Sequence, residues 1–129
     1  MVVGLKTFIR DHEIETRIIN GKLHLIMYKA VRKDYGSWWN KDLYKKIDVG
    51  AYKPKTEVVC QRLNKDRNED CGEGLHVGTK QFAFDFWTRY FILSHIVEVL
   101  VDAEDVVVPK DTDGKIRCKR LVVLRDYEV

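Results

Sequence analysis

Cysteine is scarce in this 129-residue sequence and no long apolar run occurs in it, and each absence excludes classes of protein. Charges are spread through the first 20 residues, so no N-terminal stretch is apolar enough for a signal peptide or a membrane-spanning helix. The three cysteines form no CxxC pair, which supports neither a disulfide framework nor a zinc ribbon. We therefore expect a cytoplasmic protein with reduced thiols and no membrane partner.

Repeats and low-complexity segments are also absent, and the composition is that of a globular protein. Of all residues, 45% are hydrophobic and 33% are charged, which excludes disordered and fibrous classes. A chain of this length can bury one core but not two, so we expect residues 1–129 to form a single domain. The net charge of +3 favours anionic partners only weakly and does not support a dedicated nucleic-acid-binding domain.

Short apolar or β-branched segments, separated by turn residues, predict strands in the first half of the chain. The turn pair Asn20-Gly21 separates the first two of them. The predicted strands span residues 14–19, 23–31, 46–52 and 56–61. The segment 32–46 shows no clean period, and we expect a structured loop that carries two adjacent tryptophans, Trp38 and Trp39.

The second half of the sequence predicts one helix followed by more strands. Apolar residues recur on one helical face from Thr79 to about Phe91, and Thr79 is a suitable N-cap. The later strands are predicted at residues 96–101, 105–108 and 115–124. On the first of these, alternating valines share one side and Glu98 lies on the other. This order predicts an α+β fold, a largely antiparallel sheet with one amphipathic helix packed on it.

Five blocks of residues occur in a fixed order along the chain. They span residues 27–35, 66–68, 71–76, 103–111 and 115–118. In order and spacing these blocks resemble rIIB-like proteins, the rapid-lysis B proteins of tailed bacteriophages and their small stand-alone relatives. The resemblance covers roughly residues 23–125 and implies a phage accessory protein of a family associated with overcoming host exclusion systems, acting in the host cell cytoplasm. It implies no established reaction.

A second resemblance concerns residues 74–77, the helix that follows them, and the strand around Glu98. This succession is similar to the strand-helix-strand core of ADP-ribosyltransferases, in which a late glutamate helps to hold NAD. Tyr28 and Lys29 lie on the corresponding early strand, but no His-Gly or Arg-Gly pair follows there. The resemblance therefore implies either an NAD-using enzyme or a nucleotide-holding cleft without catalysis.

The loop 66–77 gathers charge, a thiol, two glycines and an imidazole between two apolar segments, which is unusual for a plain connection. Cys71 and His76 suggest a catalytic pair or, with Cys118, zinc ligands, but ligands without short pair spacing are a weak signal. His76 bonded to loop carbonyls is an equally weighted structural alternative. We assign no metal and no catalytic residue, and we interpret Cys71 and His76 as the rim of a binding cleft.

Arginines and lysines alternate along the last predicted strand. Arg117, Lys119 and Arg125 are expected on its outer, solvated face, where with Lys115 and Arg120 they also form a stripe that attracts phosphate. Glu98, on an apolar strand, must face solvent, meet a cation or line a cleft, because burying an unpaired carboxylate is costly.

The leading hypothesis is a counter-defence protein that sequesters a nucleotide-like, ADP-ribose-type ligand, without chemistry and without a cofactor. The predicted ligand-binding residues are Tyr28, Lys29, Arg32, Trp38, Arg67, Asn68, His76 and Glu98. Basic side chains are expected at phosphates, the amide and imidazole at polar edges, and an aromatic ring at a base. Two alternatives stay open: an ADP-ribosyltransferase-like enzyme using NAD, and a protein-interaction module that inhibits a host protein through its aromatic loop.

Overall fold

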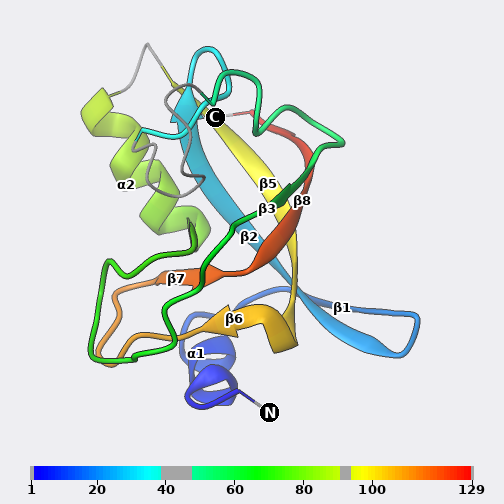
Figure 1. Cartoon of the computed structure of the whole chain (residues 1–129), viewed down its shortest axis with the longest axis vertical. Coiled ribbons are helices and arrows are strands. Elements are labelled where there is room, and N and C mark those ends of the chain that lie inside the picture. The colour runs from blue at the N-terminus through cyan, green and yellow to red at the C-terminus, as the bar shows by residue number, and fades with distance from the viewer. Residues whose placement is uncertain (1, 39–47, 91–93, 129) are drawn as a thin grey trace.

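The computed structural model describes residues 2–38, 48–90 and 94–128, which form an antiparallel sheet with two α-helices against it (Figure 1). The strands are β1 (Thr16–Ile19), β2 (Lys22–Arg32), β3 (Glu57–Val59), β4 (Leu75–Gly78), β5 (Ser94–Asp102), β6 (Val106–Val107), β7 (Lys115–Cys118) and β8 (Arg120–Tyr127). The helices are α1 (Leu5–Asp11) and α2 (Lys80–Tyr90), with a 3-10 turn η3 (Ala103–Asp105). None of these helices is long and apolar enough to cross a membrane.

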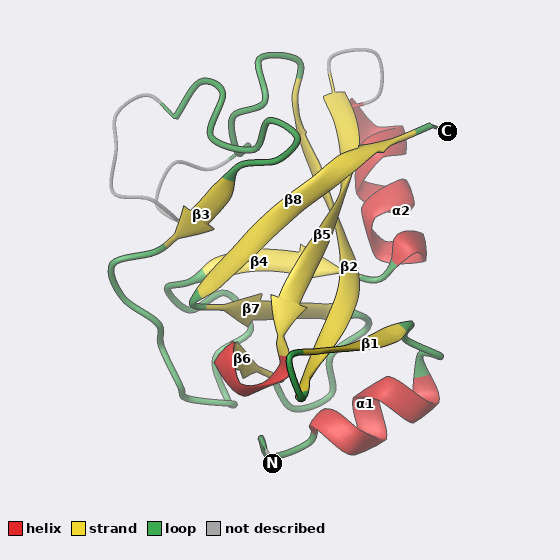
Figure 2. Ribbon diagram, turned by 90° about the vertical axis from the view of Figure 1, so that its right-hand side faces the viewer, coloured by secondary structure: helices red, strands yellow, loops and turns green. Residues whose placement is uncertain are grey.

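The strands are ordered β3-β8-β5-β2-β4-β7-β6, and β1 pairs with β2 beside this path. Every strand pairing in the described segments is antiparallel, as the order of elements predicted. The sheet bends sharply at one point, because β2 and β4 share only the pair Tyr28 and Gly78. Figure 2 shows the result: β4, β7 and β6 run across the direction of β2, β5 and β8.

The main core lies on the inner side of this bent sheet. Leu25 and Met27 of β2 stand opposite Val101 and Val99 of β5, and all four side chains are fully buried. The expected alternation on β5 is confirmed, since its valines face this core and Glu98 faces the other way. Each such side chain contributes about 1.5–3 kcal/mol on burial.

Helix α1 is a feature that the sequence analysis did not predict. It covers one end of the main core, at the bottom of the molecule in both views (Figures 1 and 2), with Leu5 and Phe8 buried. These two residues are three positions apart and so lie on one helical face. Gly4 precedes them with φ at +80°, a left-handed conformation that suits glycine.

Helix α2 lies against the outer side of β2 and β5. Its residue Ala83 is buried with Ile26, Tyr28 and Ile96, and Trp87 packs against this second cluster. Thr79 caps the helix as predicted, because its hydroxyl oxygen accepts a hydrogen bond from the Phe82 amide at 3.0 Å.

Two predicted strands differ from the structure. Residues 115–124 form two strands rather than one, since β7 ends at Cys118 and β8 begins at Arg120. From the predicted strand 46–52, residue 48 has no regular structure, residues 49–52 form turns, and the rest of that prediction lies outside the described residues. Trp39 also lies outside them.

Arg117 does not lie on the outer, solvated face that was expected for it, whereas Arg125 is exposed as expected. The Arg117 side chain is fully buried, because the loop between β3 and β4 folds over β7. The guanidinium donates hydrogen bonds to the backbone carbonyls of Asn64, Glu69 and Asp66, at 2.7, 2.6 and 2.6 Å. The desolvation that accompanies this burial lowers the pKa of Arg117. Arg117 thus fixes the shape of the charged loop that the sequence analysis singled out.

Candidate functional site

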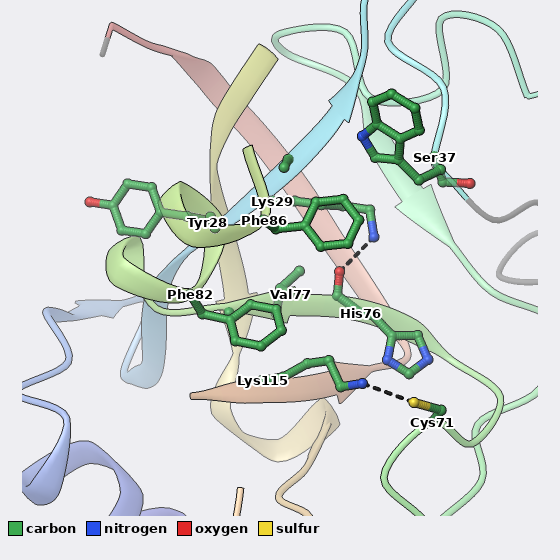
Figure 3. Close-up of a pocket in the computed structure, with 13 residues that line it drawn as sticks. Tyr28, Lys29, Ser37, Cys71, His76, Val77, Phe82, Phe86 and Lys115 are labelled. Atoms are coloured by element: carbon green, nitrogen blue, oxygen red, sulfur yellow. Dashed lines mark hydrogen bonds between the residues drawn. The ribbon is translucent and has the colours of Figure 1, made fainter. Parts of the chain in front are cut away.

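A cleft of about 390 Å³ opens where β4 crosses β2 and the first turns of α2 pass above them. The loop before β4 and the segment after β2 complete its walls. Figure 3 shows the residues that line it.

One wall of the cleft is apolar and largely aromatic. It is formed by Ala30, Trp38, Val77, Phe82, Ala83 and Phe86. Phe82 and Phe86 are one helical turn apart on α2, which places both rings on the same face. The ring centroid of Trp38 lies 6.4 Å from that of Phe86 with the planes tilted by 59°. A flat, apolar ligand group would meet aromatic surface from two directions here.

Gly78 allows α2 to approach this closely. A β-carbon at this position would lie 2.7 Å from Cδ1 of Phe82 and 3.0 Å from its Cβ. The first distance is shorter than real carbon contacts and the second is tighter than most of them, so any larger residue would push the Phe82 ring or the helix away. Gly78 also stands opposite Lys115 in the register of β4 and β7.

The remaining side chains of the cleft are polar. They are Tyr28, Lys29, Ser37, Cys71, His76 and Lys115. The Lys115 ammonium donates to the Cys71 sulfur at 3.0 Å, and the Lys29 ammonium donates to the His76 carbonyl at 2.6 Å (Figure 3). Burial raises the pKa of the Tyr28 phenol above its usual value, although the nearby Lys80 ammonium opposes the shift.

His76 shows the structural contact that was weighed as its alternative role. Its Nε2 lies 2.8 Å from the Gly72 carbonyl oxygen, so the ring donates a hydrogen bond to this loop carbonyl. This bond ties the loop to β4 four residues later. The imidazole still lines the cleft, so its predicted contact with a ligand stays a prediction.

The charge of the cleft has one sign. Among the described residues that line it, two are lysines and none is aspartate or glutamate. Lysines concentrated in a partly closed, apolar cavity create a positive potential that water screens weakly. The cleft is therefore suited to an anion.

Four of the eight predicted ligand-binding residues line the cleft: Tyr28, Lys29, Trp38 and His76. Arg32 does not, because its guanidinium pairs with Asp34 at 3.1 Å and with the buried Asp48 at 2.8 Å. Arg32 instead lines a second, more open depression, and Trp38 lines this depression as well.

The other three predicted residues lie elsewhere. The Arg67 Nε donates to the Val108 carbonyl at 2.8 Å, and the guanidinium lies against Gly4. Asn68 is exposed in a turn, where its backbone amide donates a hydrogen bond to the Asp66 carboxylate. Glu98 is only 7% exposed, and its carboxylate meets the Arg125 guanidinium at 3.0 Å. Of the three outcomes weighed for Glu98, the structure shows the encounter with a cation.

Sequence reasoning missed several residues of the cleft. Phe82 and Phe86 were read as a helix face on the sheet, and their spacing gave no sign that the rings extend past its bend. Lys115 was named only as part of a phosphate-attracting stripe with Arg117 and was not among the predicted ligand-binding residues. The two do share one side of β7, but a loop covers Arg117 and leaves Lys115 at the cleft.

A metal site finds no support in the described segments, where no three His, Cys, Asp or Glu side chains could hold an ion. Cys118 lies opposite Leu75 in the register of β7 and β4, and both are buried in the main core. The adjacent cross-strand pair, Arg117 and His76, faces the other side of the sheet. Cys118 therefore cannot join Cys71 and His76 around one ion.

Comparison with known proteins gave no match to any family model, curated protein or solved structure. The resemblances to rIIB-like proteins and to ADP-ribosyltransferases stay predictions from the sequence.

Proposed function

We propose that this protein binds and sequesters a small, nucleotide-like anion in the cleft, without chemistry. The observation that carries the proposal is the combination of an aromatic wall with two lysines and, among the described lining residues, no carboxylate. A nucleotide presents the matching pair of features, a flat base and a negative phosphate.

The dimensions and contacts of the cleft support this ligand class. Its volume of about 390 Å³ falls in the range of roughly 300–1,000 Å³ that small-molecule sites occupy. Stacking on an aromatic side chain contributes about 1–3 kcal/mol per base, and it tolerates any base because each has a flat face. Trp38 and Phe86 are placed to supply it.

Sequestration accounts for the site better than NAD chemistry does. An ADP-ribosyltransferase-like enzyme needs its glutamate at the bound nucleotide. Glu98 instead pairs with Arg125 and is not among the residues that line the cleft. A protein that traps a nucleotide signal would also suit the counter-defence role that the rIIB-like sequence blocks imply.

Isothermal titration calorimetry with a panel of ADP-ribose, AMP, cyclic AMP and other nucleotides tests the proposal. We expect saturable binding of at least one member, and loss of that binding in Phe86→Ala. Phe84→Ala is the matched control, because Phe84 belongs to the same helix, is 39% exposed and does not line the cleft. Absence of binding across the panel would overturn the proposal.

A further inference from the structure

The two lysines of the cleft are held in different ways. Lys29 points inward from β2, where its ammonium donates to the His76 carbonyl at 2.6 Å and lies 5.1 Å from the centre of the Tyr52 ring. These contacts join β2 to β4 at the bend of the sheet. Lys29 is thus part of the framework of the cleft.

Lys115 is held by a weaker partner. Its ammonium donates to the sulfur of Cys71, which is exposed on the loop. Sulfur is a weak hydrogen-bond acceptor, whereas a phosphate oxygen is a strong one and carries charge. A bound phosphate would therefore displace Cys71 from Lys115 at little cost.

The two ends of the cleft carry different groups. Figure 3 shows Lys115, Cys71 and His76 together at one end and Ser37 at the other, with Phe86 between them. Trp38 follows Ser37 in the chain, and its ring centroid lies 6.4 Å from that of Phe86, so the aromatic corner lies on the Ser37 side of the cleft. A ligand that reaches both must carry its ring and its anionic group at opposite ends.

We propose that Lys115 determines the specificity of the cleft, and that the ligand is a nucleoside monophosphate type of molecule bound in one orientation. Its base lies on the Trp38 and Phe86 corner, and its phosphate replaces Cys71 as the partner of Lys115. This inference rests on the proposed function, because it names the class of ligand that the same site binds and the orientation in which that ligand lies.

Calorimetric titration with three matched pairs tests it: adenosine and AMP, guanosine and GMP, uridine and UMP. For the base that binds, we expect the monophosphate to bind the wild-type protein roughly tenfold or more tightly than the nucleoside, as a charge-assisted hydrogen bond requires. In Lys115→Met the ratio should fall toward one, while the affinity for the nucleoside stays unchanged. Lys110→Met is the control, because Lys110 is exposed and does not line the cleft.

The outcomes separate the two proposals. If no member of any pair binds, this inference fails, and the proposed function fails with it only when the wider nucleotide panel, ADP-ribose included, also gives no binding. If nucleoside and monophosphate bind equally well, or if Lys115→Met keeps the wild-type ratio, only the inference is overturned and a binding cleft remains. A Lys115→Met protein with wild-type nucleoside affinity is folded, so its ratio is interpretable.

Cys71→Ser gives a second, independent check. It removes the thiol but not the ammonium, and it leaves the loop held by Arg117 and His76. We expect the preference for the monophosphate to persist in this variant. Its disappearance would show that Cys71, rather than Lys115, selects the ligand, and that result would count against the inference.

Discussion

The guanidinium of Arg117 donates a hydrogen bond to the backbone carbonyl of Asp66 over 2.6 Å, from a side chain with 0% solvent exposure. Two further carbonyls, of Asn64 and Glu69, accept from the same group. One strand residue thus organises the loop that carries Cys71 to the cleft. The stability of the loop and the shape of the cleft are coupled through this arginine.

Arg117→Met is therefore expected to lower the free energy of unfolding by about 2–4 kcal/mol, because three carbonyls lose a charged donor at once. Nucleotide binding should weaken as well, since the loop loses its anchor. Urea unfolding followed by fluorescence measures the first effect and calorimetry the second. Lys119→Met is the control, because Lys119 is partly exposed on the same segment and its ammonium donates to the Gln61 carbonyl, at 3.1 Å. Equal effects of the two substitutions would contradict the prediction.

The burial of Arg117 also shows where prediction from sequence ends. Alternation along β5 correctly assigned its valines to one side and Glu98 to the other, because a period of two is a local property. The same rule places Lys115 and Arg117 on one side of β7. It cannot tell which of them a distant loop will cover, since that depends on tertiary structure.

The cleft was predictable only in part for the same reason. Tyr28 and Lys29 are neighbours on β2 and point to opposite sides, yet both line the cleft, because β4 crosses β2 beside them. The sequence contains no signal for that crossing. Arg32 and Arg67 carry the charge that a phosphate needs. In the folded protein, however, Arg32 is paired with two carboxylates and Arg67 with a backbone carbonyl.

Gly78→Ala should disturb both the fold and the cleft. The added carbon would lie 2.7 Å from Phe82, and such overpacking typically costs about 1–3 kcal/mol. Phe82→Ala removes the obstructing ring, so Gly78→Ala should cost much less in that background. A double-mutant cycle of unfolding free energies measures this coupling. Additive effects would show that the contact with Phe82 is not the reason for the glycine.

Asp48→Asn is expected to weaken the aromatic corner of the cleft. The Asp48 carboxylate is buried, pairs with Arg32 at 2.8 Å and accepts the Ser37 amide at 2.8 Å, next to Trp38. Breaking a buried pair costs about 2 kcal/mol or more. We expect a shift in tryptophan fluorescence and weaker nucleotide binding. Asp34→Asn is the matched control, since the Asp34 carboxylate bonds to the same Arg32 from an exposed position.

Asp34 itself should make a small, pH-dependent contribution to stability. The Gly36 amide donates to its carboxylate at 2.9 Å and, with Arg32, lowers the pKa of Asp34. The folded state therefore favours the ionised form. The contribution is fully present above the unfolded pKa of about 3.9 and is lost as the pH falls through the lower folded value. The difference in unfolding free energy between the wild type and Asp34→Asn should shrink from pH 7 to pH 2, and a constant difference would contradict this.

Glu98→Gln distinguishes the binding protein from the NAD-using enzyme. The carboxylate lies on the α2 side of β5, directly opposite Tyr28, and it holds Arg125 rather than facing the cleft. We expect a modest fall in the midpoint of thermal unfolding, because the ion pair with Arg125 is lost while the shape of the side chain is kept. Affinity for the nucleotide should not change. An NAD-hydrolysis assay that gives a signal with the wild type and none with Glu98→Gln would instead assign catalysis to this glutamate, and sequestration without chemistry would then be wrong.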